Sequence, residues 1–206
     1  MNRIAVVGAS GHGKVVAEIA EICGFEVVFV DDTYPISSSV ECWPIVSNFN
    51  ELIYGGSKIK YAIVAIGNNK VRSKLSKQLI DSGFELPVLV HPNAVVSKYA
   101  TIESGTVICS IAVVNAFSKV GSNCIINTGA IVEHDCVLGD NVHLSPNVSL
   151  AGGTIISDLV WLGIGSVTKE LVRIGRASVI GANSTVLSDI TAGVTVYGSP
   201  AVRQVL

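Results

Sequence analysis

The sequence has few charged and few aromatic side chains. Charged residues make up 15% of the 206 residues and aromatic residues 6%, and the formal net charge is −2. No basic stripe interrupts this pattern, so binding to nucleic acid through bulk electrostatic attraction is disfavoured. Hydrophobic residues, by contrast, account for 49% of the chain, and its mean hydropathy is +0.56.

The chain also lacks a long hydrophobic run, although a membrane-spanning helix needs about 20 mostly apolar residues. The apolar stretch Ile59–Ile66, for example, contains Lys60 and ends at Gly67. The N-terminus carries only a short apolar run that leads into the turn at Gly8, which is too brief for a signal peptide. We therefore expect a soluble cytoplasmic protein with an apolar core and no membrane span.

The cysteine pattern gives no disulfide framework and no zinc motif. There are five cysteines, an odd number, and no Cys-x-x-Cys pair, which fits a reducing compartment. They are Cys23, Cys42, Cys109, Cys124 and Cys136. None shows a base partner, so we expect no cysteine nucleophile.

The first 90 residues alternate strand-like and helix-like segments. We expect strands at Arg3–Val7, Phe25–Val30, Tyr61–Ile66 and Val88–Val90, and helices at Lys14–Cys23 and Val71–Ser82. Strands that alternate with helices favour a parallel sheet. Residues 1–92 are therefore predicted to form a Rossmann-like α/β domain that binds a nucleotide.

From Val96 onward the hydrophobic period becomes six. Every sixth position from 96 to 186 is aliphatic except Thr168, and a small or β-branched residue often follows four positions later. Cys124 and Cys136 occupy such small positions, which indicates a packing role. This period is typical of a parallel β-helix with coils of about 18 residues. Residues 93–206 are predicted to form that β-helix, with coils spaced like ordinary strands.

Several motifs together resemble the sugar O- and N-acyltransferase family of bacterial sialic-acid and bacillosamine pathways. They are Gly8–Val15, Asp31-Asp32, Ala65–Asn69 with Arg72, Asn127-Thr128 through Cys136, and Gly198–Ala201. The greatest likeness is to UDP-4-amino-sugar N-acetyltransferases. The resemblance implies a left-handed β-helix, a homotrimer, acetyl-CoA bound along the β-helix near a subunit boundary, and a sugar nucleotide held by the N-terminal domain.

The glycine-rich loop lies between the first expected strand and helix, where backbone N–H groups suit a phosphate. Carboxylates after the second strand can accept hydrogen bonds from ribose or a base, and the third strand ends at the same edge. The acceptor-binding candidates are Ser10, Gly11, His12, Gly13, Asp31, Asp32, Gly67 and Asn68. The alternative is a tight turn that needs glycine only for its backbone freedom.

Of the four histidines, His134 is the candidate general base, because an amine that attacks a thioester must lose a proton. Asp135 or Glu133 would orient its ring, and the alternative is an exposed loop histidine. The family often has Glu where this chain has Asp135. His91 is expected to be a hydrogen-bonded junction residue. A γ-carbonic-anhydrase-like zinc site needs three histidines, and the β-helix region offers two, so we expect no metal.

His143 matches a family position that contacts acetyl-CoA. It lies half of one coil beyond His134, so the two cannot stack on one face of one subunit, although a trimer could bring them together. The family places further cofactor contacts at Gly152, Gly163, Ile164 and Ala182, and coil-corner geometry is the alternative explanation for these small residues. Lys169, Arg173 and Arg176 are candidate anchors for the CoA phosphates by charge alone.

The leading hypothesis is direct transfer of acetyl from acetyl-CoA to the 4-amino group of a UDP-linked amino-deoxy sugar, with His134 as base and Asp135 as its orienting partner. The near alternatives are N-acetylation of GDP-perosamine and O-acetylation of a sialic acid. The distant alternative is a non-catalytic trimer that binds a sugar nucleotide. The sequence leaves open the sugar, the base and whether nitrogen or oxygen is acylated.

Overall fold

A computed structural model of the chain describes residues 1–203. The chain folds as two compact units, Met1–Leu89 and the part from Val90 onward. We call them the α/β unit and the β-helix. No helix among residues 1–203 is long and apolar enough to cross a membrane.

The α/β unit is built on a five-stranded sheet with the order β3-β4-β2-β1-β5. Its strands are β1 (Asn2–Val7), β2 (Phe25–Val30), β3 (Ser39–Val40), β4 (Trp43–Ser47) and β5 (Tyr61–Val64). β1 pairs in parallel with β2 and β5, and β2 with β4, while β3 runs antiparallel to β4. The predicted parallel sheet is confirmed.

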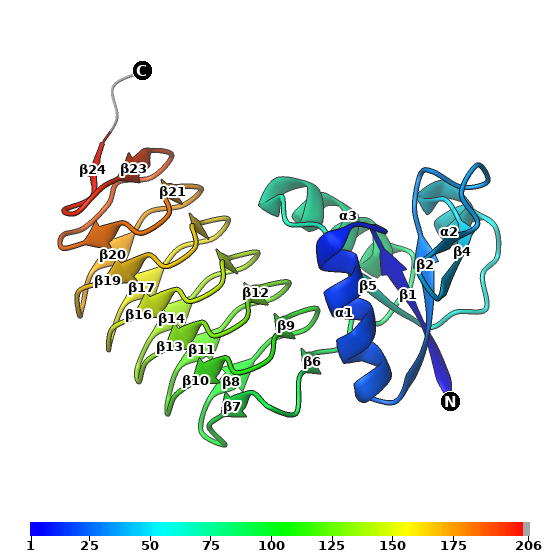
Figure 1. Ribbon diagram of the computed structural model, residues 1–206, viewed down its shortest axis with the longest axis horizontal. Coiled ribbons are helices and arrows are strands. Elements are labelled where there is room, and N and C mark those ends of the chain that lie inside the picture. The colour runs from blue at the N-terminus through cyan, green and yellow to red at the C-terminus, as the bar shows by residue number, and fades with distance from the viewer. Residues whose placement is uncertain (204–206) are drawn as a thin grey trace. The chain divides into compact units, whose positions relative to one another are not determined.

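Helices cover both faces of this sheet (Figure 1). They are α1 (Gly11–Ile22), α2 (Phe49–Tyr54) and α3 (Asn69–Asp81). Leu52 of α2 and Leu79 of α3 share one buried cluster with residues of β1, β2 and β5. Phe29 of β2 points to the opposite face, where its ring lies close to Gly13 of α1. Alternation of side chains along buried parallel strands therefore produces two apolar surfaces, each covered by helix.

The segment that forms β3, β4 and α2 was not predicted. Pro44 interrupts its strand pattern, and proline is found mainly in edge strands. β4 tolerates Pro44 because its second neighbour is only the two-residue strand β3, in which Ser39 lies opposite Pro44. The short helix α2 begins at an Asn48 cap whose side chain accepts a hydrogen bond from Glu51 N.

The β-helix has three sheets of very short strands, which pair in parallel except for the antiparallel pair β23–β24 at the end of the first sheet (Figure 1). The first sheet contains β6 (Leu89–Val90), β9 (Val107–Ile108), β12 (Ile125–Ile126), β15 (His143–Leu144), β18 (Trp161–Leu162), β21 (Val179–Ile180), β23 (Thr195–Tyr197) and β24 (Val202–Arg203). The second contains β7 (Val95–Val96), β10 (Val113–Val114), β13 (Ile131–Val132), β16 (Ser149–Leu150), β19 (Val167–Thr168) and β22 (Thr185–Val186). The third contains β8 (Thr101–Ile102), β11 (Lys119–Val120), β14 (Val137–Leu138), β17 (Ile155–Ile156) and β20 (Arg173–Ile174).

Strands of one sheet pair from coil to coil at the predicted spacing, so the predicted coil length is confirmed; Ile125, for instance, lies opposite His143. The aliphatic column fills the axis, where Leu144 and Leu150 are fully buried. Thr168, the one exception, is also buried, and its hydroxyl accepts a hydrogen bond from Ala151 N. The hydroxyl therefore has a partner inside an apolar core.

The corners of the β-helix require an unusual backbone. From Gly105 to Asn183, residues at every sixth position have a positive φ, among them Ile111, Phe117 and Leu171. Such angles are uncommon outside glycine, asparagine and aspartate. We call these the turn positions, and Asp135 occupies one of them with φ 59°.

One expected strand belongs to a different sheet. Val88–Val90 was predicted as the last strand of the α/β domain, but Leu89–Val90 is β6 and pairs with β9 of the β-helix. Val90 lies one six-residue unit before Val96 and packs against the axial core. The six-residue period therefore starts one unit earlier than predicted. In the α/β unit, Glu85 forms an isolated bridge with Tyr61 of β5 in place of the predicted last strand.

Candidate functional site

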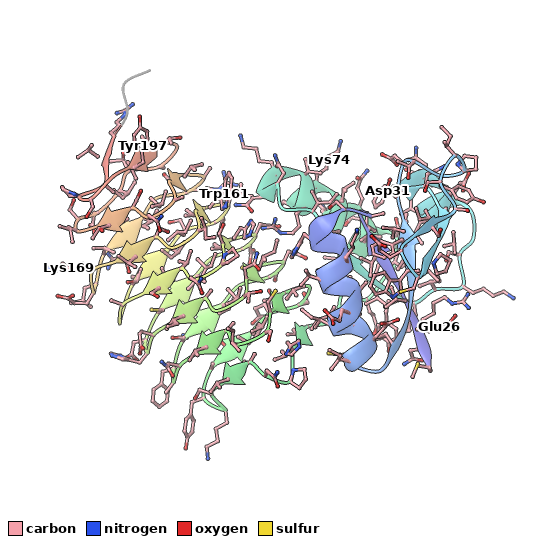
Figure 2. All side chains as sticks on the ribbon, viewed as in Figure 1. Glu26, Asp31, Lys74, Trp161, Lys169 and Tyr197 are labelled. Atoms are coloured by element: carbon pink, nitrogen blue, oxygen red, sulfur yellow. The ribbon has the colours of Figure 1, made fainter. Side chains whose placement is uncertain are left out.

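The carboxyl edge of the α/β sheet carries a pocket of about 260 Å³. Gly8, Asp31 and Asp32 follow β1 and β2, and Ile66 follows β5. Residues of α2 and α3 complete the lining, including Phe49, Asn50, Lys74 and Gln78; Figure 2 labels Asp31 and Lys74. Ligands of open α/β sheets bind at this edge, where connections leave toward opposite faces.

The two adjacent aspartates have different surroundings. Asp31 Oδ2 accepts a hydrogen bond from Ala9 N at 2.8 Å, and Oδ1 accepts from the backbone N and hydroxyl of Thr33. Burial opposes ionisation of Asp31, but these hydrogen bonds outweigh it and hold the pKa of the carboxyl below its usual value. Asp32 is exposed at the pocket. Asp31 therefore ties the glycine-rich loop to the end of β2, and Asp32 is the carboxylate left exposed at the pocket.

The glycine-rich loop is shaped by close backbone packing. Helix α1 starts at Gly11, and Ser10 is the N-cap of this helix. The turn after β1 is therefore shorter than predicted. A Cβ atom at Gly13 would lie 2.1 Å from the carbonyl oxygen of Gly8. Gly13 is therefore needed for the first turn of α1 to approach β1, which supports the packing explanation for this residue. Ser10 and Gly11 are exposed at the N-terminus of α1, where a helix offers N–H groups to an anion.

A buried arginine organises the loop after β5. The guanidinium of Arg72 donates to the carbonyl oxygens of Ile66 and Gly67 and to Asn69 Oδ1. Asn68 caps α3, and its side-chain oxygen accepts from the backbone N–H groups of Lys70 and Val71. Of the two predicted ligand residues here, Gly67 is thus held through its carbonyl, and the side chain of Asn68 is occupied by the cap.

His12 lies in the first turn of α1 and is largely buried. Burial, and next the positive charge of Arg72, lower the pKa of His12 to about 4. The imidazole is therefore neutral at pH 7 and can take part in recognition as a hydrogen-bonding group but not as a cation.

In the β-helix, His134 and Asp135 form a hydrogen-bonded pair at the corner between the second and third sheets. His134 Nδ1 lies 2.8 Å from Asp135 Oδ2, and the two side chains are 64% and 63% exposed. Glu133 points elsewhere, because its carboxylate accepts from Asn115 Nδ2. The open question about the carboxylate partner of His134 is thus answered in favour of Asp135. A carboxylate on Nδ1 favours the tautomer that leaves Nε2 free to accept a proton.

His143 lies on the first sheet and faces outward from β15. Its ring stacks on Trp161, one coil further along, with centroids 6.1 Å apart and an interplanar angle of 17°. Trp161 Nε1 donates to Ser145 Oγ at 2.9 Å, which fixes the indole. Sequence reasoning did not select Trp161, although its position exactly one coil after His143 was a sufficient signal.

The predicted cofactor residues fall into two groups. His143, Gly163, Ile164 and Ala182 belong to the first sheet and the turn that follows it, whereas Gly152 lies beside the ring of His134. A Cβ at Gly163 would be 2.7 Å from Ala182 N, so tight coil packing explains that glycine, while Ile164 and Ala182 are exposed. Figure 2 shows Trp161 and Lys169 on opposite sides of the β-helix. Trp161 stacks on His143, and Lys169 follows β19 at the same corner at which His134 follows β13.

The buried thiols have packing roles. Cys124 Sγ and Cys136 Sγ lie 3.2 and 3.3 Å from the carbonyl oxygens of Gly139 and Ala151, and both residues are buried. Burial raises the pKa of the Cys136 thiol and raises that of Cys109 to about 12, which disfavours the nucleophilic thiolate. Residues 1–203 contain no group of three potential metal ligands.

Two family descriptions match the chain, one in each unit. Residues 3–79 match the PglD N-terminal domain, and residues 117–152 match the bacterial transferase hexapeptide of six repeats. Fold and motif together define the class of hexapeptide-repeat transferases that carry an N-terminal α/β domain.

Solved structures extend the likeness over the whole chain. The acetyltransferase domain of PglB from Neisseria gonorrhoeae is 39% identical, with a TM-score of 0.95 over 99% of this chain and 100% of that one; it has also been solved with acetyl coenzyme A. PerB from Caulobacter crescentus, solved with CoA and GDP-perosamine, is 35% identical, with a TM-score of 0.92 over 99% of this chain and 98% of that one. The chain belongs to this family of bacterial sugar acyltransferases, and its β-helix is left-handed as predicted.

Curated relatives match over a shorter stretch. UDP-N-acetylbacillosamine N-acetyltransferase of Bacillus subtilis is 35% identical over 115 residues, and GDP-perosamine N-acetyltransferase of Escherichia coli O157:H7 is 31% identical over 115 residues. Each match covers 52% of this chain and 51% of the relative, so the chain spans about half the length of the curated relatives it matches.

Proposed function

We propose that this chain is an acetyl-CoA-dependent N-acetyltransferase that acts on a nucleotide-linked amino sugar. The single observation that carries the proposal is the His134–Asp135 pair, joined at 2.8 Å on the outer surface of the β-helix. It is a hydrogen-bonded base in a family whose named relatives are N-acetyltransferases.

The proposed reaction needs no covalent enzyme intermediate. The amine of the sugar attacks the thioester carbonyl carbon, His134 Nε2 accepts the proton that the nitrogen loses, and the thiolate of CoA leaves as the amide forms. The proton on Nε2 then passes to that sulfur, so the products are the N-acetyl sugar and free CoA thiol. Asp135 stabilises the imidazolium that forms between the two proton transfers.

The α/β unit would hold the nucleotide of the acceptor in its 260 Å³ pocket. Asp32 would accept hydrogen bonds from ribose or base, and the N-terminus of α1 at Ser10 and Gly11 would receive the phosphates. Among candidate acceptors we favour a UDP-linked 4-amino-deoxy sugar, since of the two curated relatives the bacillosamine-type enzyme, at 35% identity, is more similar than the perosamine-type enzyme, at 31%. GDP-perosamine is the second candidate.

We also propose that the enzyme works as a homotrimer in the cytoplasm. The catalytic pair and the group around His143 lie on different edges of one β-helix, so a complete donor site requires the edges of two copies. The outward face of the second sheet supplies apolar surface for such contacts, with Val95 and Val167 exposed. All five cysteines are free thiols, as suits a reducing compartment.

A thiol-release assay tests the proposal. Acetyl-CoA should release free CoA in the presence of a UDP-4-amino-deoxy sugar and much more slowly with GDP-perosamine. The mass of the acetylated product distinguishes N- from O-acylation. Absence of CoA release with every UDP- and GDP-amino sugar, from protein that binds them, would support the non-catalytic alternative.

A further inference from the structure

Gly152 lies directly against the ring of His134. It occupies the same corner position as His134, one coil further along the β-helix. A Cβ atom at Gly152 would be 2.6 Å from His134 Cε1, 2.7 Å from Nε2 and 3.3 Å from Nδ1. Real Cβ atoms essentially never approach another nonbonded heavy atom more closely than 3.0 Å. The optimal separation between nonbonded carbon atoms is about 3.5 to 4.0 Å. The ring therefore occupies the space that any side chain at position 152 would need.

The backbone does not explain this glycine. Gly153, the next residue, occupies a turn position with φ 67°, whereas the φ of Gly152 is not positive. A residue with a side chain could adopt that conformation without strain. Other glycines of the β-helix with ordinary φ are needed for coil packing: a Cβ at Gly121 would lie 2.6 Å from the carbonyl oxygen of Gly139, and one at Gly163 would press on backbone. At Gly152, the three nearest atoms all belong to one imidazole.

From this geometry we infer that Gly152 is a positioning residue for the base. Its bare backbone forms the surface on which the imidazole of His134 lies, and the Asp135 hydrogen bond fixes the rotation of the ring on that surface. The inference rests on the proposed function and adds to it, because it assigns Gly152 a contact with the base beside the predicted contact with CoA.

A methyl group at position 152 would displace the ring and not the coil. The side chain of His134 is 64% exposed, so it can rotate away, whereas the backbone of the coil is held by Gly153 N donating to His134 O at 2.9 Å. The expected result is a folded protein whose base has moved by an ångström or more. A misplacement of that size costs about 10²-fold in rate.

The test compares Gly152→Ala with Ser188→Ala, which lies in the same corner column two coils further along. We expect Gly152→Ala to lower kcat by roughly 10- to 100-fold, with KM for acetyl-CoA essentially unchanged and an unchanged circular dichroism spectrum. ¹⁵N NMR of the His134 ring should show loss of the Nδ1–H tautomer that Asp135 favours. Ser188→Ala should match the unmodified protein in all of these measurements.

Combining the substitution with His134→Ala separates the two roles of Gly152. If the glycine acts through the ring, Gly152→Ala causes no further loss of rate or of acetyl-CoA affinity once the ring is gone. Equal loss of acetyl-CoA affinity with and without His134 would identify a donor contact and overturn the inference, as would an unchanged ring spectrum in Gly152→Ala. A changed ring spectrum in a protein without any acetyltransferase activity would refute the proposed function and leave the positioning contact intact.

Discussion

The two units present their polar residues in opposite ways. In the α/β unit, Asp31, Asn68 and Arg72 are each engaged by hydrogen bonds to nearby backbone. In the β-helix, His134 and Asp135 bond to each other and are otherwise mostly exposed. The pocket of the α/β unit is thus formed within one chain, whereas the corner of the β-helix leaves the proposed base largely open to solvent. In terms of the proposed function, the nucleotide pocket is therefore more completely formed within one chain than the site around the base.

The largest effect should come from removing the base. His134→Ala is expected to lower kcat by about 10²- to 10⁴-fold and to leave acetyl-CoA binding nearly unchanged, because the predicted donor contacts are spread along the coils. Steady-state CoA release and calorimetric titration with CoA measure the two quantities.

Cys136→Ser serves as the control for that experiment. Ser118, at the equivalent small position one coil earlier, donates its hydroxyl to the carbonyl oxygen of Glu133, so a serine at 136 can replace the thiol contact with Ala151. Most of the activity should remain. A dead, folded Cys136→Ser protein alongside an active His134→Ala protein would require an acyl-cysteine mechanism instead.

Mixing two inactive variants tests whether the exposed corner is completed by a second copy. His134→Ala and His143→Ala subunits, unfolded together at equal amounts and refolded, should regain about one quarter of the normal activity, since one in four interfaces then pairs an intact His134 with an intact His143. Activity no higher than that of the separate variants would show that both histidines serve within one subunit, and a monomer by light scattering would contradict the trimer.

The two aspartates should separate recognition from loop structure. Asp32→Ala is expected to raise the acceptor KM by about tenfold, the cost of a lost hydrogen bond to a charged group, with no change in melting temperature. Asp31→Ala leaves Ala9 N without its acceptor and should destabilise the α/β unit by about 1–3 kcal/mol. Thermal melts and acceptor kinetics measure both; an equal rise of the acetyl-CoA KM in Asp32→Ala would argue against a divided site.

The smallest expected effect is a pH dependence of the α/β unit through His12. Its pKa is about 4 in the folded chain and about 6.5 when unfolded, so the unfolded chain binds the extra proton between these values. Stability should therefore be fully present above about pH 6.5 and decline as the pH falls toward about 4. Between pH 7 and pH 5 the loss should be about 2 kcal/mol.

The three described helices all lie in the α/β unit, so urea unfolding followed by far-ultraviolet circular dichroism reports on that unit. His12→Gln should remove this share of the pH dependence. The same slope in both proteins would mean that the burial of His12 does not control the acid sensitivity.

The sequence predicted the β-helix more completely than the α/β unit, because a period repeated over many coil faces averages out local exceptions such as Thr168. Single signals fared less well. Pro44 concealed an edge strand, and the two adjacent aspartates looked equivalent until the hydrogen bond from Ala9 distinguished them. The contact between Gly152 and His134 follows from the coil length, but glycine in a coil has several possible reasons, and only side-chain geometry selects among them.

The fixed pairing of each coil with the next also constrains how such a chain can change in length. Insertion or deletion of one whole coil preserves every axial, small and turn position on both sides, whereas any other length change rotates the following residues onto different faces. Asp135 depends on this phase, because its carboxylate reaches His134 from a turn position where aspartate tolerates positive φ. Duplication or loss of coils would therefore lengthen or shorten the β-helix in steps of whole coils, with the corner that carries His134 and Gly152 kept in phase.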